Sequence, residues 1–196
     1  MTTAASVVTP ERYETGLKSF MEWMRHIENR HEEFQKHYDE YTPNADDIAA
    51  VKALVDAHGV KVLVLGENWC PDVWRGLPVV ARMAEATGMT ARYFPRDENK
   101  DIMAEFLNKG EFESIPTMVF YDKNHKHLGT WIERPVEAIE DMARLRKEIL
   151  EPAPQEDGPE KTAARAAYSA ATNDLRGNWR HASLREMREL LESALK

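Results

Sequence analysis

The sequence predicts an α/β fold in which helices flank a central mixed β-sheet. Short apolar segments suit strands, helical patterns separate the first three of them, and a polar turn separates the last two. The expected strands span residues 60–65, 90–94, 117–121 and 128–133. A helix between two strands favours parallel pairing, whereas a tight turn favours a hairpin. The predicted sheet is therefore mixed.

The first expected strand, residues 60–65, is nearly all apolar and rich in β-branched side chains. This composition is typical of a strand buried on both faces. A helix over residues 45–58 precedes the strand and stops at Gly59, and a second helix runs from Pro71 to about residue 86 and stops at Gly88. Two more helices are expected after the second and fourth strands, over residues 97–107 and 135–150.

The leading segment carries an apolar stripe whose members recur alternately every four and three residues, with His31 in the one polar slot. The members of this stripe are Tyr13, Leu17, Phe20, Met24, Ile27, Phe34, Tyr38 and Tyr41. The pattern predicts a long amphipathic N-terminal helix within residues 1–43, about four heptads long. Such a stripe must be buried, which leaves two alternatives open: packing within the chain, or a homodimer formed through this helix.

The end of the chain predicts a linker followed by a helix. Residues 151–160 are proline-rich and acidic, which is typical of a linker. One short amphipathic helix is expected from the apolar positions Leu184, Met187, Leu190, Leu191 and Leu195. The chain thus divides into a leading helix (1–43), an α/β domain (44–150), and a linker with a helical C-terminal extension (151–196).

Composition narrows the classes of function. The chain has 196 residues, a net charge of -8 and one cysteine. Nucleic acid is not an expected partner, because its binding depends on basic surface. We expect no membrane segment and no secretory signal, since no apolar run or N-terminal pattern suits either. We expect a cytoplasmic protein, because a lone cysteine forms no internal disulfide. The histidine spacings predict no metal site.

The single cysteine, Cys70, lies where a strand and a short loop lead into a helix. The unpaired N–H groups and the dipole of a helix N-terminus stabilise an anion, so a thiol at this position ionises more readily. Asp72 opposes that effect as a nearby negative charge. We therefore expect a modest lowering of the Cys70 pKa.

The segment "NWCPDVWRGLP" resembles the active-site segment of thioredoxins, with Pro71 and Asp72 between the two cysteine positions. Pro78 falls where thioredoxins carry a proline that kinks the helix. The segment "SIPTMVFYD" is similar to the one in which Pro116 would be the cis-proline that faces the thiol. The resemblance covers about residues 46–150. The leading helix, "RDEN" and "WIERP" look more like a group of bacterial thioredoxin-like proteins.

The resemblance implies an oxidoreductase with two departures from the family pattern. Val73 stands at the position of the resolving cysteine, and Val64 stands at the position of a buried acid that assists proton transfer. Cys70 can therefore attack a disulfide on a protein or a small molecule, but an external thiol such as glutathione must release the product. No other cofactor is expected.

The expected substrate contacts lie around the thiol. The resemblance implies contacts from Trp69, Pro71, Asp72, Ile115 and Pro116. Two charged residues near the thiol, Arg96 and Glu67, each have more than one expected role. The arginine follows a strand end, where it could hold an anionic group of the substrate, pair with the aspartate, or form a surface salt bridge. The glutamate is either a solvated loop carboxylate or an acid–base aid to the thiol.

Two other classes of function compete with thiol–disulfide exchange. The missing second cysteine and the missing buried acid favour a binding or scaffold module that has lost redox chemistry. The third alternative is iron–sulfur or glutathione binding across a dimer, with Cys70 as one ligand.

Overall fold

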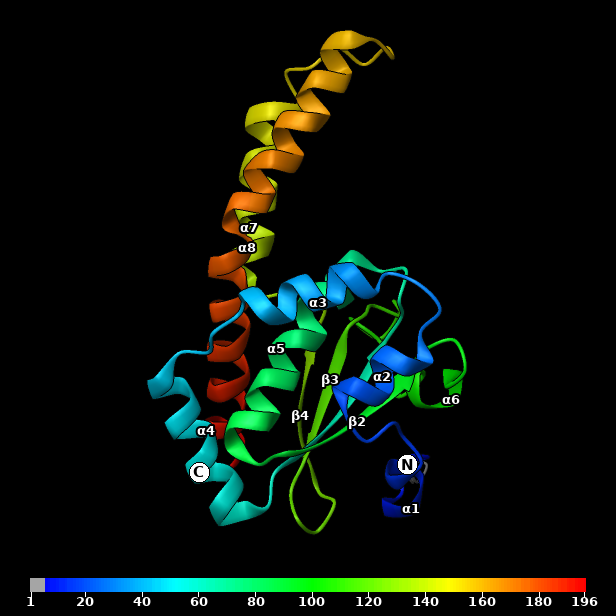
Figure 1. Cartoon of the computed structure of the whole chain (residues 1–196), viewed down its shortest axis with the longest axis vertical. Coiled ribbons are helices and arrows are strands. Elements are labelled where there is room, and N and C mark those ends of the chain that lie inside the picture. Colours follow the sequence, from blue (N-terminus) through cyan, green and yellow to red (C-terminus); the bar gives the residue numbers. More distant parts are fainter. Residues whose placement is uncertain (1–5) are drawn as a thin grey trace.

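The computed structural model describes residues 6–196 and contains a four-stranded mixed sheet with helices packed around it (Figure 1). The strands are β1 (Lys61–Gly66), β2 (Thr90–Pro95), β3 (Thr117–Tyr121) and β4 (His127–Ile132), in the order β2-β1-β3-β4. β1 pairs parallel with β2 and antiparallel with β3, and β3 forms a hairpin with β4. The predicted α/β fold with a mixed sheet is confirmed.

β1 is a central strand, as its composition predicted. Four consecutive side chains of this strand have no exposed surface, namely Val62, Leu63, Val64 and Leu65. Helices and neighbouring segments cover both faces of the sheet at this strand, so both sets of alternating side chains lie in the core. The carboxyl end of β1 leads through a short loop to the cysteine.

The helix after β1, α5 (Pro71–Thr87), positions that cysteine. Cys70 is its N-cap, and Pro71 occupies the first helical position, where the missing N–H would have no helical partner. Gly88 ends the helix with a left-handed φ of 74°. The helix packs against α3 (His31–Glu40), α4 (Ala45–His58) and α8 (Pro159–Ala194), which hold it in the middle of the helical layer.

The prediction of one long leading helix is wrong. The segment forms α1 (Pro10–Glu14), α2 (Phe20–His26) and α3. Between α1 and α2 the chain extends, and Leu17 exchanges two backbone hydrogen bonds of 2.9 Å with Tyr93 at the edge of β2. A helical residue could not make this strand-like bridge. Arg30, with a left-handed φ of 69°, redirects the chain before α3.

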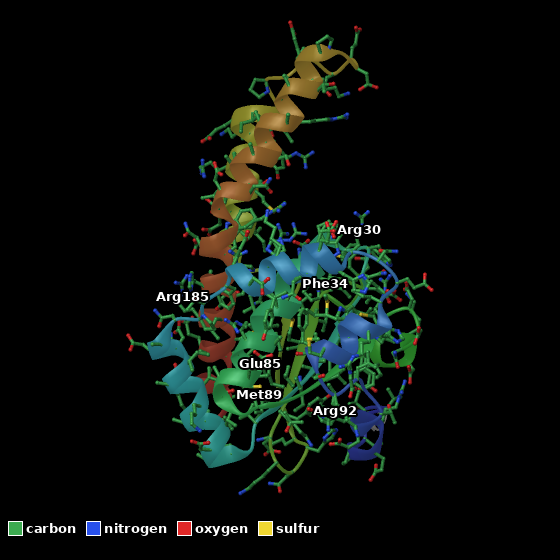
Figure 2. All side chains as sticks on the ribbon, in the orientation of Figure 1. Arg30, Phe34, Glu85, Met89, Arg92 and Arg185 are labelled. Carbon is green, nitrogen blue, oxygen red and sulfur yellow. The ribbon has the colours of Figure 1, made fainter. Side chains whose placement is uncertain are left out.

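The apolar stripe of the leading segment is largely buried within the chain. Four of its aromatic members, Tyr13, Phe20, Phe34 and Tyr41, are at most 4% exposed. Phe34 lies on α3, which crosses the body of the molecule (Figure 2). Of the two alternatives left open by the sequence, the structure shows packing within the chain. These four side chains are therefore buried and not available for contacts with a second copy.

The helix expected over residues 97–107 is much shorter, because α6 spans only Lys100–Met103. Beyond α6 the chain turns, and the N–H of Asn108 donates to the Phe112 carbonyl over 2.8 Å. This turn carries the chain back across the sheet edge toward residues 114–116, which precede β3. The shortened helix thus leaves room for the loop that contains Pro116.

The C-terminal helix is far longer than predicted. α7 (Val136–Leu145) continues through a π-helical turn (Arg146–Leu150), and α8 then returns beside it. The two form a helical hairpin that projects from the body (Figure 1). The proline-rich segment predicted as a linker supplies the turn at the tip of this hairpin. Within residues 6–196 no helix has the length and apolar character needed to cross a membrane.

The second half of α8 docks on the sheet. Three of its side chains, Leu184, Met187 and Leu191, are completely buried. A Cβ at Gly129 on β4 would lie 2.6 Å from Cδ2 of Leu190, so glycine lets this leucine pack closely where the helix crosses the strand. The C-terminal extension is therefore part of the core that supports β4 and the loop after it.

Candidate active site

The Cys70 thiol lies between the start of α5 and the loop before β3. Its Sγ donates a hydrogen bond to the carbonyl oxygen of Ile115 over 3.7 Å. The residue is half-buried and packs against the core. The cysteine thus lies at the mouth of the site, as its position at a predicted helix start indicated.

The peptide bond between Ile115 and Pro116 is cis, as the resemblance implied. Two hydrogen bonds to backbone carbonyls hold this loop: the N–H of Glu133 donates to the Pro116 carbonyl over 2.7 Å, and the Thr117 hydroxyl donates to the Ser114 carbonyl, also over 2.7 Å. Ile115 as a whole is 5% exposed, so its side chain offers little contact surface to a substrate.

Gly76 allows the helix and the cis-proline loop to meet. A Cβ on this residue would lie 2.6 Å from Cγ of Pro116 and 3.3 Å from Cε of Met118. Only glycine fits at that distance, although glycine inside a helix costs about 1 kcal/mol relative to alanine. The close approach brings the first turns of α5, which begin at Cys70, against the Pro116 loop.

The two residues that depart from the dithiol pattern are both apolar and fully buried. Val73, at the position of the resolving cysteine, has no exposed surface and packs against Gly66. Val64, at the position of the buried acid, is equally enclosed in β1. Position 73 therefore offers Cys70 no second thiol, and position 64 offers it no acid for proton transfer.

The expected lowering of the thiol pKa is wrong, because burial raises the pKa of Cys70. The N–H of Val73 and the positive charges of Arg134 and Arg75 act in the opposite direction, but they do not overcome the loss of hydration. Glu133 adds to the increase as a nearby negative charge. The helix start does favour the thiolate, yet desolvation of a half-buried sulfur outweighs it.

Asp72 has a different role from the one predicted. Its carboxylate is held between two arginines, with an ion pair to Arg75 and another to Arg134 at 2.6 Å. Arg134 also pairs with Glu133. Because two guanidinium groups neutralise Asp72, the acid that acts on the thiol is Glu133, at the end of β4.

Trp69, the residue before Cys70, is in contact with Arg96. Trp69 is 54% exposed, and the Arg96 guanidinium lies 5.3 Å from the centre of one of its rings. Arg96 pairs with Asp97 at 2.8 Å and with Glu113 at 3.2 Å, so the expected alternative of a pair with Asp72 is wrong. The arginine stacks on the tryptophan and supports it, and its own charge is already balanced.

Pro71, Trp74 and Glu67 complete the surroundings of the thiol. Pro71 is exposed beside Cys70. Trp74 is half-buried, and its Nε1 donates to the Asn68 carbonyl, which fixes the loop before the cysteine. The Glu67 carboxylate accepts a 2.7 Å hydrogen bond from the Asp97 N–H, and burial raises its pKa. Glu67 is therefore a partly desolvated anchor between two loops rather than a freely solvated carboxylate.

The sequence analysis missed three charged residues that act on the thiol. Arg75, Glu133 and Arg134 come from α5 and from the segment "WIERP", whose position after the last predicted strand was their only signal. They reach Cys70 because the end of β4 lies beside the cis-proline loop. Among the described residues, no three His, Cys, Asp or Glu side chains gather as a metal site would require.

Comparison with solved structures supports the fold. An HIV epitope scaffold designated 4E10_S0 is 17% identical with a TM-score of 0.65, covering 96% of this chain and 99% of the other. A protein of unknown function from Pseudomonas aeruginosa, PA1234, is 19% identical with a TM-score of 0.61, covering 97% of this chain and 99% of the other. At such identities the likeness is one of fold alone.

The sequence itself carries the family assignment. No curated protein matches the chain. The family described as thioredoxin matches residues 17–148, which is more than half of the 196 residues. This match includes Cys70, the cis-proline and all four strands. The chain therefore belongs to the thioredoxin family, as a member with a single cysteine at the head of α5.

Proposed function

We propose that this protein is a monothiol member of its family that exchanges disulfides through Cys70. The observation that carries the proposal is the placement of Cys70, a half-buried residue whose Sγ lies 3.7 Å from the carbonyl oxygen of Ile115, beside the cis-Pro116 peptide. A disulfide brought along that loop would meet the sulfur directly. The exposed face of Trp69 adds a flat apolar contact next to the reacting atom.

The proposed reaction has two exchange steps. The Cys70 thiolate attacks one sulfur of a substrate disulfide, forms a mixed disulfide with it, and releases the other substrate sulfur as a thiolate. An external thiolate, such as that of glutathione, then attacks the substrate sulfur of the mixed disulfide and releases Cys70 as a thiolate. Each step breaks one sulfur–sulfur bond and forms another, so no other oxidant or cofactor takes part. A reducing compartment such as a bacterial cytoplasm would supply the external thiol.

An extended segment of the substrate would bind beside the cis-proline. The N–H of Ile115 makes no hydrogen bond within residues 6–196, although the carbonyl of the same residue accepts the thiol proton. A free backbone donor just before the start of β3 can pair with an extended peptide that reaches it. This arrangement favours a protein or peptide disulfide over a compact small molecule.

The raised pKa sets a condition on the reaction. Because burial keeps the resting thiol protonated, only a small share of the protein carries the nucleophile at neutral pH. Substrate that covers Glu133 or pairs with it would remove the charge that opposes ionisation. We therefore expect slow exchange with small disulfides and faster exchange with substrates that occupy the site.

A second function, a binding module without redox turnover, is favoured by a specific observation. Val73 and Val64 are apolar and fully enclosed, and the thiol pKa is raised rather than lowered. In that alternative the surface around Trp69 and the Pro116 loop holds a partner segment, and Cys70 contributes only packing and its hydrogen bond to Ile115. Replacing the sulfur by oxygen would then leave binding intact.

Turnover of a glutathionylated peptide in the presence of reduced glutathione separates the two functions. For monothiol exchange we expect deglutathionylation by the wild-type protein and a fall to the uncatalysed rate in Cys70→Ser. A matched control is Ser114→Ala, which lies in the neighbouring loop and leaves the sulfur in place. Equal rates for the wild-type protein and Cys70→Ser would support the binding module.

A further inference from the structure

Residues of α3 and α8 line a hollow of about 210 Å³ that opens to solvent. The two helices come together close to where the helical hairpin leaves the body (Figure 1). Its wall includes Lys36, Arg176 and Arg180 as cations and Glu40 as a carboxylate, and His37 also contributes. Burial and the nearby arginines lower the pKa of His37 to about 3, so its ring is neutral at pH 7. The wall therefore has a net charge of two positive in a protein whose net charge is -8.

Arg176 contributes an uncompensated positive charge to this hollow. Within residues 6–196 its guanidinium makes no hydrogen bond and no ion pair, and its Nε is buried without a partner. Burial and the neighbouring Arg180 lower its pKa, which reflects a positive charge with too little compensation. A half-buried unpaired guanidinium is costly, and an anion that accepts its hydrogen bonds would remove that cost.

Arg180 supplies a second, more deeply placed donor group. The residue is 8% exposed, and one terminal nitrogen donates to Nδ1 of His37 over 2.9 Å. The same nitrogen lies 3.5 Å from the Glu40 carboxylate, while the Nε of Arg180 has no partner. The neutral imidazole holds the guanidinium in place without cancelling its charge. Such a fixed fork suits the bidentate recognition of a phosphate.

The helix sequence also fits a ligand at this place. Arg176 and Arg180 are one turn apart, a spacing at which like charges repel each other. Gly177 lies between them in the interior of α8 and also lines the hollow. A Cβ at this position would meet no atom within 4 Å, so packing does not require the glycine. Two features that each destabilise a helix thus coincide on the wall of one cavity.

From this geometry we infer that the hollow between α3 and α8 is a binding site for a small phosphate-class dianion, held by Arg176 and Arg180 with Lys36 at the rim. The two unbalanced positive charges match the charge of a phosphate dianion. The amide of Asn173 lines the same wall and adds a neutral donor. Free phosphate and a phosphate monoester share this chemistry. The site does not depend on the redox role of Cys70.

Titration calorimetry of the full chain with inorganic phosphate tests this site, at constant ionic strength set with potassium chloride. We expect saturable binding of one phosphate per chain, weakened at least about tenfold in Arg176→Gln. Because Arg176 has no partner among the described residues, this variant loses no ion pair seen there and should fold, which circular dichroism checks. Cys70→Ser should bind phosphate as the wild-type protein does.

Arg185→Gln is the matched control, since Arg185 lies on the same helix, is exposed and faces Glu137 instead of the hollow (Figure 2). It should change the dissociation constant by less than about twofold. Titration with glycerol phosphate distinguishes the two sources: tighter binding than inorganic phosphate indicates an ester, and equal binding indicates the free anion. An absence of saturable binding, or equal weakening by Arg176→Gln and Arg185→Gln, would overturn the site.

Discussion

The Cys70 thiol donates its hydrogen bond to the carbonyl oxygen of Ile115, the residue whose peptide bond to Pro116 is cis. This contact joins two segments that are far apart in the sequence, the head of α5 and the loop before β3. It also defines the resting state of the site, because a thiol that donates a hydrogen bond is protonated. The chemistry of the protein therefore starts from a neutral sulfur that must lose its proton before it can attack.

The first expectation concerns that proton. Burial and the Glu133 carboxylate raise the pKa of Cys70, so alkylation by iodoacetamide at pH 7 should be slower than that of an unstructured cysteine peptide. Removing the negative charge in Glu133→Gln should lower the thiol pKa and shift the rate profile toward lower pH. Glu137→Gln, on the neighbouring α7, should leave the profile unchanged. A profile in Glu133→Gln shifted toward higher pH would contradict the electrostatic account.

The second expectation concerns the missing thiol. Val73 lies in the first turn of α5, and its N–H bonds to the Cys70 carbonyl over 3.0 Å. Cysteine is smaller than valine, so Val73→Cys should fold and should restore a dithiol. We expect this variant to reduce insulin disulfides with dithiothreitol faster than the wild-type protein, whose mixed disulfide must wait for the external thiol. Val79→Cys, on a buried position further along the helix, is the matched control and should show no such gain.

The third expectation concerns the contact between α5 and the cis-proline loop. Gly76→Ala would place a Cβ 2.6 Å from Pro116, so overpacking should destabilise the fold by about 1–3 kcal/mol despite the better helix propensity of alanine. The same substitution at Gly177, in α8, meets no atom and should stabilise the fold by up to about 1 kcal/mol. Urea unfolding in phosphate-free buffer measures both changes. Equal effects would mean that the close approach at Gly76 is absent.

The fourth expectation concerns acid sensitivity. Burial and the arginines around His37 lower its pKa to about 3, far below the usual value of about 6.5 in an unfolded chain. Between these two pH values the unfolded state binds a proton at His37 that the folded state does not bind. The free energy of unfolding should therefore fall as the pH drops from about 6.5 toward 3. His37→Gln should make the decline between pH 7 and pH 5 shallower, and the exposed His181→Gln should not. Urea midpoints at the two pH values decide between them.

Structural features that depend on one short segment were predictable from the sequence, whereas contacts between distant elements were not. The apolar residues 60–65 predicted the central strand, and the segments around Cys70 and Pro116 predicted the family and the cis peptide. The heptad pattern in the leading segment failed because the bridge from Leu17 to Tyr93 interrupts the helix. No local pattern reports such a bridge, since its partner lies more than seventy residues away along the chain.

The same limit applies to the site. The position of Cys70 at a helix start predicted its location correctly, but the sign of its pKa shift depends on burial by residues of other elements. Asp72 was close to the thiol in sequence, yet Arg75 and Arg134 neutralise it, and Glu133 arrives from the far end of β4. The length of α8 was missed for a related reason. Its first half is rich in alanine and has few large apolar side chains, because it pairs with the other arm of the hairpin away from the core.

The central claim is that Cys70 alone forms a covalent intermediate that an external thiol resolves. Intact mass spectrometry after incubation with glutathione disulfide tests it most directly, with reduced glutathione added in a second step. We predict that one glutathionyl group attaches to the wild-type protein, none attaches to Cys70→Ser, and the added thiol removes the group completely. A wild-type protein that stays unmodified under conditions that modify a free cysteine peptide, or an adduct that reduced glutathione does not remove, would contradict the account.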